Sequence, residues 1–185
     1  KLGKKTVIWS YFRHNIEYVG KYLLKDINAE YIHGGVEMGD SDEELETRKY
    51  KIKKFKDINS DCMTLVANYA SCAEGISLHK ACHNAIYLDR SFQADQYLQS
   101  VDRICRLGNN DEKNIIILQN KIPRSLKNID LTVNLALQKK IDDMGRFLND
   151  PDLRQISLNE TRGVDPIDNN ISESDLQLIV NEFLI

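Results

Sequence analysis

Short, uninterrupted apolar segments alternate with helical patterns along the first 120 residues, and this alternation most limits how the chain can fold. The strand-like segments are rich in β-branched and aromatic residues and occupy 6–12, 30–33, 63–68, 84–89 and 114–119. Between them, apolar residues recur at the three- and four-residue intervals of amphipathic helices, over 15–26, 48–56 and 94–107. Strands without polar alternation are typical of parallel sheets that helices cover on both faces. The sequence therefore predicts an α/β fold with a mainly parallel sheet between helices.

The pattern changes after residue 125. Residues 130–149 predict one long helix, whose apolar stripe consists of Leu131, Leu135, Leu137, Ile141, Met144 and Leu148. Residues 150–171 are polar, and Ser172 opens a final amphipathic helix with a variant of the capping box. We therefore expect a lobe over 1–125, a long helix over 126–150, and a polar linker with a short helical tail over 151–185.

Composition excludes some classes of protein. The chain has 185 residues with a net charge of −3, and no apolar run approaches the roughly 18 residues that a membrane span needs. Its start does not resemble a signal peptide, so we expect an intracellular protein; the absence of an initial Met suggests part of a longer chain. Four cysteines without a CxxC pair predict buried free thiols. His79, Cys82 and His83 lack a second pair of ligands, so we expect no metal site.

Two blocks of opposite charge follow one another. Residues 37–46 carry only acidic charges and residues 48–56 only basic ones. The acidic block is typical of a solvated loop. The basic helix leaves two interpretations open, a solvated face or a surface for nucleic-acid phosphates formed by Lys51, Lys53 and Lys54.

A glutamine and two arginines share one side of the predicted helix over 94–107. Gln99, Arg103 and Arg106 fall within about 60° of one another on a helix, opposite its apolar side. Guanidinium groups at such an edge can stabilise the charge on a transferring phosphoryl group. Functional groups of parallel sheets lie beyond the carboxyl ends of strands, where Gly34 and the 68–77 loop follow strands. We therefore expect the arginine helix and these loops to meet at one edge of the sheet.

The phosphate-binding half of an ATPase site is missing from the sequence. A P-loop requires the pattern GxxxxGK[ST], and neither Gly-Lys pair of the chain fits it. The sequence therefore predicts only half of an ATP site, without the loop that binds the phosphates.

Four segments resemble motifs of a known family in the same order. They are KTVIWSYF (5–12), YIHGG (31–35), LVANYASCAEGISLHKACHNAIYLD (65–89) and QYLQSVDRICRLGN (96–109). Together they resemble the second RecA-like lobe of a superfamily 2 helicase, and within that group the Snf-type DNA translocases. The resemblance covers about residues 5–120. The chain departs from the family pattern at Cys72-Ala73, Ser77, Cys105 and Asn109.

The resemblance implies a three-layer α/β/α lobe with roles for particular residues. Arg106 would be the arginine finger, Arg103 its partner and Gln99 the residue that orients both. Gly75 and Ser77 would approach the nucleotide. The residues expected along the nucleic-acid backbone are Ser10, Gly34, Gly35, Asn68 and Ser71.

The resemblance also implies partners. ATP with Mg²⁺ would be held mainly by an amino-terminal RecA-like lobe that this sequence lacks, and the long helix would brace the two lobes. We expect double-stranded DNA as the nucleic acid, a protein partner at the tail helix and no membrane.

The preferred interpretation is the second motor lobe of an ATP-dependent DNA helicase or translocase, inactive without its P-loop lobe. Two alternatives stay open: a RecA-like binding module without turnover, and a lobe of an RNA-directed superfamily 2 helicase.

Overall fold

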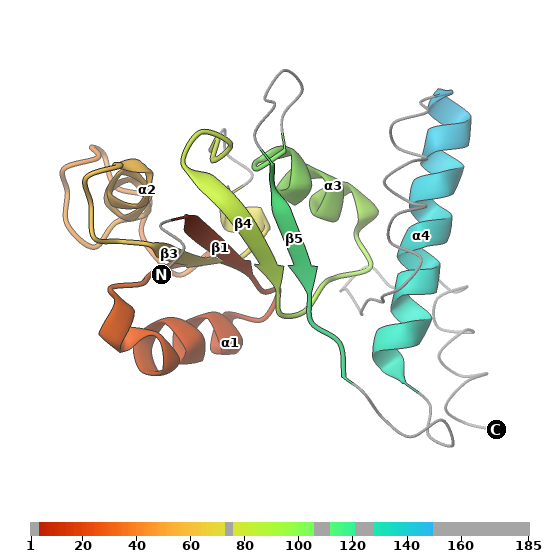
Figure 1. Cartoon of the computed structure of the whole chain (residues 1–185), viewed down its shortest axis with the longest axis horizontal. Helices are drawn as coiled ribbons and strands as arrows, with labels where there is room; N and C mark the ends of the chain where they lie inside the picture. Colours follow the sequence, from red (N-terminus) through yellow and green to blue (C-terminus); the bar gives the residue numbers. More distant parts are fainter. Residues whose placement is uncertain (1–3, 73–75, 106–111, 121–127, 150–185) are drawn as a thin grey trace. The chain divides into compact units, whose positions relative to one another are not determined.

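The computed structural model describes residues 4–72, 76–105, 112–120 and 128–149 (Figure 1). The chain divides into two compact units, each described by itself below. The first unit comprises residues 1–88 and 96–117, and the second comprises residues 89–95 and 118–185. The domain boundaries expected at residues 125 and 150 stay predictions.

The first unit is built on a parallel sheet, as the apolar runs predict. Its strands are β1 (Lys5–Trp9), β2 (Glu30–Ile32), β3 (Thr64–Ala67), β4 (Cys82–Tyr87) and β5 (Asn114–Ile117). They pair in the order β2-β3-β1-β4-β5, and every pair is parallel. The α/β prediction is confirmed, although β1, β2, β3 and β5 are shorter than the apolar runs that predict them and β4 begins and ends two residues earlier than its run.

Helical segments connect the strands. α1 (Arg13–Tyr18) continues into a π-helical turn over Val19–Leu23 and a 3₁₀ turn over Lys25–Ile27. The single helix expected over 15–26 is therefore three short segments. α2 (Arg48–Lys56) precedes β3, and α3 (Ala94–Asp102) follows β4.

Apolar side chains fill both faces of the sheet. On one face, Ile8 and Val66 pack with Ile16 of α1. On the other, the ring of Tyr87 lies 5.2 Å from the ring of Tyr97 on α3. Because neighbouring residues of a strand point to opposite faces, a continuous apolar run lets β1, β3 and β4 bury both sides.

Strand β5 differs from the buried strand that its run of isoleucines suggests. It lies at the end of the strand order, and Ile115 and Ile116 are exposed. An apolar run predicts strand formation here, but position in the sheet decides burial.

The second unit contains α4 (Ile129–Leu148), the long helix that the sequence predicts. Asn128 caps it, because its side chain accepts a hydrogen bond from the amide of Asp130. The buried face differs from the expected stripe. Leu137 and Ile141 are buried as expected, whereas Leu131, Leu135 and Leu148 are exposed.

Smaller residues line the buried face of α4. Val133 and Ala136 pack with Phe92, and Asn134 accepts a 2.8 Å hydrogen bond from the buried guanidinium of Arg90. Segment 89–95 therefore packs with α4. The spacing of large apolar residues in the sequence does not reveal this contact.

Three cysteines fit the thiol prediction. Cys62 and Cys82 are buried, Cys105 is half-buried, and all three are free. Burial raises the pKa of the Cys82 thiol to about 11. Among the described residues, no three His, Cys, Asp or Glu side chains are grouped to hold a metal ion. None of the described helices combines the length and apolar character needed to cross a bilayer.

Candidate functional site

Parallel pairing sorts the candidate residues between two opposite edges of the sheet. Residues 10–13, 33–36 and 68–71 follow β1, β2 and β3 and lie at the carboxyl edge. Residues 76–81 precede β4 and lie at the amino edge. α3 begins after the carboxyl end of β4 and brings the chain back toward the amino edge, from which β5 starts (Figure 1).

A backbone hydrogen bond joins two predicted nucleotide segments at the amino edge. The amide of Leu78 donates to the carbonyl of Arg103 over 2.8 Å, which brings Ser77 close to the turn after α3 that contains Arg103. The Lys113 ammonium group donates to the carbonyls of His79 and Cys82, at 2.7 and 3.0 Å. Three segments distant in sequence thus meet just before β4 and β5.

The expectation of a single functional edge is therefore wrong. Arg103 lies at the amino edge, whereas Gly34 and Asn68 follow strands at the carboxyl edge. The reason is that a crossover helix must return the chain to the amino edge before the next parallel strand can begin.

The buried and exposed sides of α3 agree with its sequence pattern. Tyr97 and Val101 are buried, Gln99 is exposed and Arg103 is half-buried. The helix ends at Asp102 rather than Leu107, although the amide of Arg103 still donates to the Gln99 carbonyl at 3.1 Å. The predicted site residues Arg106 and Gly75 lie outside the described residues.

A cavity of about 600 Å³ opens at the amino edge. It is lined by basic, small polar and apolar side chains, with no carboxylate among the described lining residues: Lys5, Lys56, Ile58, Met63, Ser77, His79, Lys80, Ala81 and His83. The hydroxyl of Ser77 lies 2.5 Å from Nδ1 of His79. The sequence does not reveal this cavity, because its basic residues are spread between positions 5 and 83.

Lys5 has a structural role in this cavity. Its ammonium group is buried and donates 2.7 Å hydrogen bonds to the carbonyls of Phe55 and Asp57, at the end of α2. Burial lowers the pKa of Lys5 despite nearby acidic groups.

Asn68 ties together the strand ends at the carboxyl edge. Its side-chain amide donates to the carbonyls of Tyr11 at 2.7 Å and Ser10 at 3.4 Å. Its side-chain oxygen accepts a hydrogen bond from the backbone amide of Ala70 at 2.9 Å, and its backbone amide donates to the carbonyl of Ile32. One side chain therefore links the loops after β1 and β3.

A column of aromatic rings supports the same loop. Tyr69 stacks on Trp9 with 5.7 Å between ring centroids and on Tyr87 at 6.1 Å. The hydroxyl of Tyr87 lies 2.9 Å from that of Ser100 on α3. The start of the 68–77 loop is thus anchored to the sheet core.

The predicted nucleic-acid residues differ in accessibility. Ser10 and Ser71 are buried, and the Ser10 hydroxyl accepts a hydrogen bond from the amide of Phe12. Gly34 and Gly35 are exposed. Only these two glycines, together with half-buried Asn68, present accessible surface among the five residues expected along the backbone.

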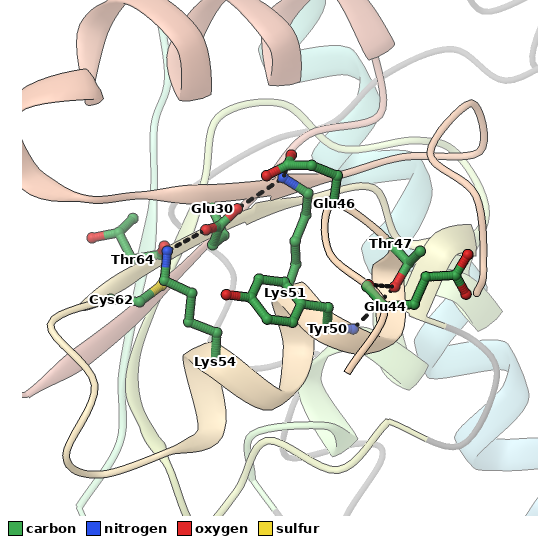
Figure 2. A network of polar contacts seen from close by, with 9 residues as sticks. All are labelled: Glu30, Glu44, Glu46, Thr47, Tyr50, Lys51, Lys54, Cys62 and Thr64. Carbon is green, nitrogen blue, oxygen red and sulfur yellow. Dashed lines mark hydrogen bonds and ion pairs between the residues drawn. The ribbon is translucent and has the colours of Figure 1, made fainter. Parts of the chain in front are cut away.

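The acidic and basic blocks pair with one another (Figure 2). The side chain of Lys51 is only 5% exposed, and its ammonium group lies 2.9 Å from Glu30 and 2.8 Å from Glu46. Lys54 lies 2.6 Å from Glu30, and exposed Lys53 lies 3.3 Å from Asp42. The basic helix is therefore neither a simple solvated face nor a set of free cations.

This pairing limits how Lys51 and Lys54 can act, whereas a phosphate contact by exposed Lys53 stays a prediction. Burial removes Lys51 from the side chains that can reach a phosphate, and Lys54 is held by Glu30. The sequence shows the two charge blocks, but it does not show that the loop folds back over the helix.

The ion pairs also affect the protonation of Glu30. Burial alone would raise the pKa of Glu30, but hydrogen bonds from Lys54 and Lys51 outweigh it and hold the pKa below its ordinary value of 4.5. The stabilisation from this lowered pKa is therefore present above 4.5 and is lost as the pH falls through the folded-state value.

Comparisons with known proteins agree with the fold. The family described as "Helicase conserved C-terminal domain" matches residues 1–108. The crystal structure of the C-terminal part of the Fun30 ATPase domain is similar, with a TM-score of 0.59 and 20% identity. It covers 98% of this chain and 48% of that one, so this chain spans about half its length. This similarity confirms the RecA-like α/β fold.

A second solved structure is more distant. The E. coli DEAD-box protein SrmB, bound to regulator of ribonuclease activity A, gives a TM-score of 0.45 and 21% identity. It covers 62% of this chain and 61% of that one. No curated protein sequence matches the chain.

The buried pairing of Lys51 predicts a large stability effect. Lys51→Ala should lower the free energy of unfolding by roughly 3 kcal/mol, because it leaves the mostly buried Glu30 with one cation fewer. Lys53→Ala, in an exposed pair, should cost less than about 1 kcal/mol. Urea denaturation at pH 7 measures both values, and equal losses would contradict the assigned role of Lys51.

The hydrogen bonds that the Asn68 side-chain amide donates predict a second effect on stability. Asn68→Asp replaces a donor with a carboxylate that faces the carbonyls of Ser10 and Tyr11, so it should lower the free energy of unfolding by about 1–3 kcal/mol. The control is Asn59→Asp at an exposed position. If the two variants melt at the same temperature, Asn68 does not hold the loops together.

Proposed function

The chain belongs to the helicase conserved C-terminal domain family, and we propose that it is the second motor lobe of an ATP-dependent, Snf-type DNA translocase. The chain is thus a C-terminal lobe of a superfamily 2 helicase. In the proposal, ATP binds between this lobe and an amino-terminal lobe, and cycles of closure and opening move the protein along DNA.

The hydrogen bond between Leu78 and Arg103 is the observation that carries the proposal. It brings the segment of Ser77 beside the turn that leads to Arg106. The family resemblance assigns both segments to the nucleotide, although they lie far apart in sequence. Their meeting at the amino edge supports a single nucleotide-facing surface.

Charge at this edge favours a phosphate-bearing ligand. The cavity beside Ser77 carries Lys56, Lys80 and His79 without an opposing carboxylate among its described lining residues. Within the described residues no acidic cluster is suited to Mg²⁺. We therefore assign Mg²⁺ and most contacts to ATP to the amino-terminal lobe, with Arg106 approaching the γ-phosphate on closure.

In the proposal the carboxyl edge faces the nucleic acid. Exposed Gly34 and Gly35 offer main-chain groups that a sugar-phosphate backbone can approach closely. Contacts of this kind carry no base information, which suits movement along any sequence. At the same edge Asn68 links the loops after β1 and β3, and Ser10 and Ser71 are buried.

The two alternatives make different predictions. A binding module without turnover would keep the fold but would not need Arg103 or Arg106 for ATP hydrolysis. An RNA-directed lobe would give turnover that RNA stimulates more than duplex DNA. Steady-state ATPase activity of the full-length protein with each nucleic acid separates the three.

The proposal predicts the effect of removing the arginine finger. In the full-length protein, Arg106→Ala should lower DNA-stimulated ATP turnover by about 10³-fold or more and leave ATP affinity largely unchanged. The reason is that a finger from the second lobe stabilises charge that develops only in the transition state. Arg106→Lys should rescue poorly, because an ammonium group lacks the planar fork.

Arg146→Ala is the matched control, because Arg146 is an exposed arginine on α4 that pairs with Asp142. It should keep normal turnover, and the isolated 185-residue chain should show none. An Arg106→Ala protein that retains most of its turnover would contradict the motor proposal.

A further inference from the structure

Arg13 lies at the carboxyl edge, although its sequence pattern did not identify it as a site residue. It is the first residue of α1, and its Nε donates to Glu17 Oε1 over 2.8 Å while its side chain stays 66% exposed. Its guanidinium group covers Gly35: a Cβ placed on that glycine would lie 2.6 Å from Nη1. An accessible cation therefore sits directly against the glycine loop.

A buried histidine holds the other side of this loop. His33 is 4% exposed, and its Nδ1 accepts a 3.0 Å hydrogen bond from the amide of Gly35. Its Nε2 lies 3.1 Å from Glu17 Oε1, the same oxygen that Arg13 contacts. Because Nδ1 accepts, the hydrogen must be on Nε2, so the imidazole is neutral and donates to Glu17.

The surroundings keep the imidazole neutral. Burial lowers the pKa of His33 below 6.5, and the charges of Arg13, Lys21 and Arg48 lower it further, against the opposing effect of Glu17. Near neutral pH, Nδ1 is therefore available as the acceptor for Gly35. The ring of Tyr31 stacks on the imidazole at 6.2 Å and restricts its orientation.

The loop itself leaves room for a ligand. Gly34 is exposed, and nothing lies within 4 Å of the position that a Cβ would occupy there. The carboxylate of Glu17 is already shared by Arg13 and His33. The outer side of the loop therefore combines a guanidinium group with open backbone.

We propose that Arg13 and the backbone of Gly34 form a phosphate-binding subsite for a nucleic-acid backbone, and that His33, which already accepts from the amide of Gly35, is its positioning residue. This inference rests on the proposed function, which places nucleic acid at the carboxyl edge. Arg13 contacts the phosphate with its outer nitrogens. His33 acts through its hydrogen bond with Gly35, which holds the loop in place beside the guanidinium group.

Binding of the 185-residue chain to a fluorescent 20-base-pair duplex of arbitrary sequence tests the role of Arg13. Arg13→Ala should weaken binding by about 5- to 10-fold. It should also reduce the slope of log affinity against log salt concentration by the contribution of about one phosphate contact. Arg13→Lys should recover part of the affinity. Lys25→Ala, which removes an exposed cation from the 3₁₀ turn after α1, should change affinity by less than about 2-fold.

Two substitutions separate the two hydrogen bonds of His33. In His33→Asn the side-chain oxygen can replace Nδ1 as acceptor for Gly35, whereas in His33→Gln the amide can replace Nε2 as donor to Glu17. The Asn variant should bind DNA within about 2-fold of wild type, and the Gln variant should bind about as weakly as Arg13→Ala. A purely structural role would weaken both variants in proportion to their loss of stability.

Amide hydrogen exchange at Gly35 tests the positioning role without nucleic acid. Exchange should be slow in the wild type and in His33→Asn, and faster in His33→Gln at equal global stability. Equal exchange in all three proteins overturns the role of His33.

The outcomes separate this inference from the proposed function. If the wild type binds duplex DNA and Arg13→Ala binds as tightly as Lys25→Ala, the subsite is wrong and the motor proposal stands. If the wild type binds no duplex, single-stranded DNA or RNA probe, both are contradicted. Preference for the RNA probe with the same Arg13 dependence supports the subsite and contradicts the choice of DNA.

Discussion

Parallel strand pairing requires each connection to carry the chain from the carboxyl edge of the sheet back to the amino edge, and this requirement places every candidate residue of the first unit. With the strand order β2-β3-β1-β4-β5, the loops after β1, β2 and β3 gather at one edge. The end of α3 and the segment before β4 gather at the other. Two surfaces with different chemistry follow from one rule of connectivity.

At each edge of the sheet, a few polar contacts hold neighbouring segments together. Asn68 links the ends of β1 and β3, and the hydrogen bond from Leu78 to Arg103 links the segments at the amino edge. These contacts are backbone-directed and lie where the chain leaves regular structure, so each satisfies groups that the strands leave unpaired.

Sequence patterns predicted the parallel sheet, the long helix and the buried side of α3, because these depend on local spacing of apolar residues. The exposure of Ile115 on β5 and of Leu131, Leu135 and Leu148 on α4 was not predicted, because it depends on which neighbour an element meets. The charge blocks were visible, but their mutual pairing through Lys51 requires a loop to fold back over α2.

The candidate site was predictable only in part. Motif order indicated Ser77 and Arg103, yet their common edge came from the crossover geometry. Arg13 gave only an i,i+4 pairing with Glu17 in the sequence, a feature that many exposed helices share. Its position against Gly35 depends on β2 and α1 meeting in space.

The assignment of nucleic acid to one edge and nucleotide to the other can be measured directly by hydrogen–deuterium exchange of the full-length protein. Duplex DNA alone should slow exchange over 10–13, 33–36 and 68–71. A non-hydrolysable ATP analogue alone should slow it over 76–79 and 103–105. Protection of both sets by the same ligand, or the reverse assignment, would contradict the division of functions between the two edges.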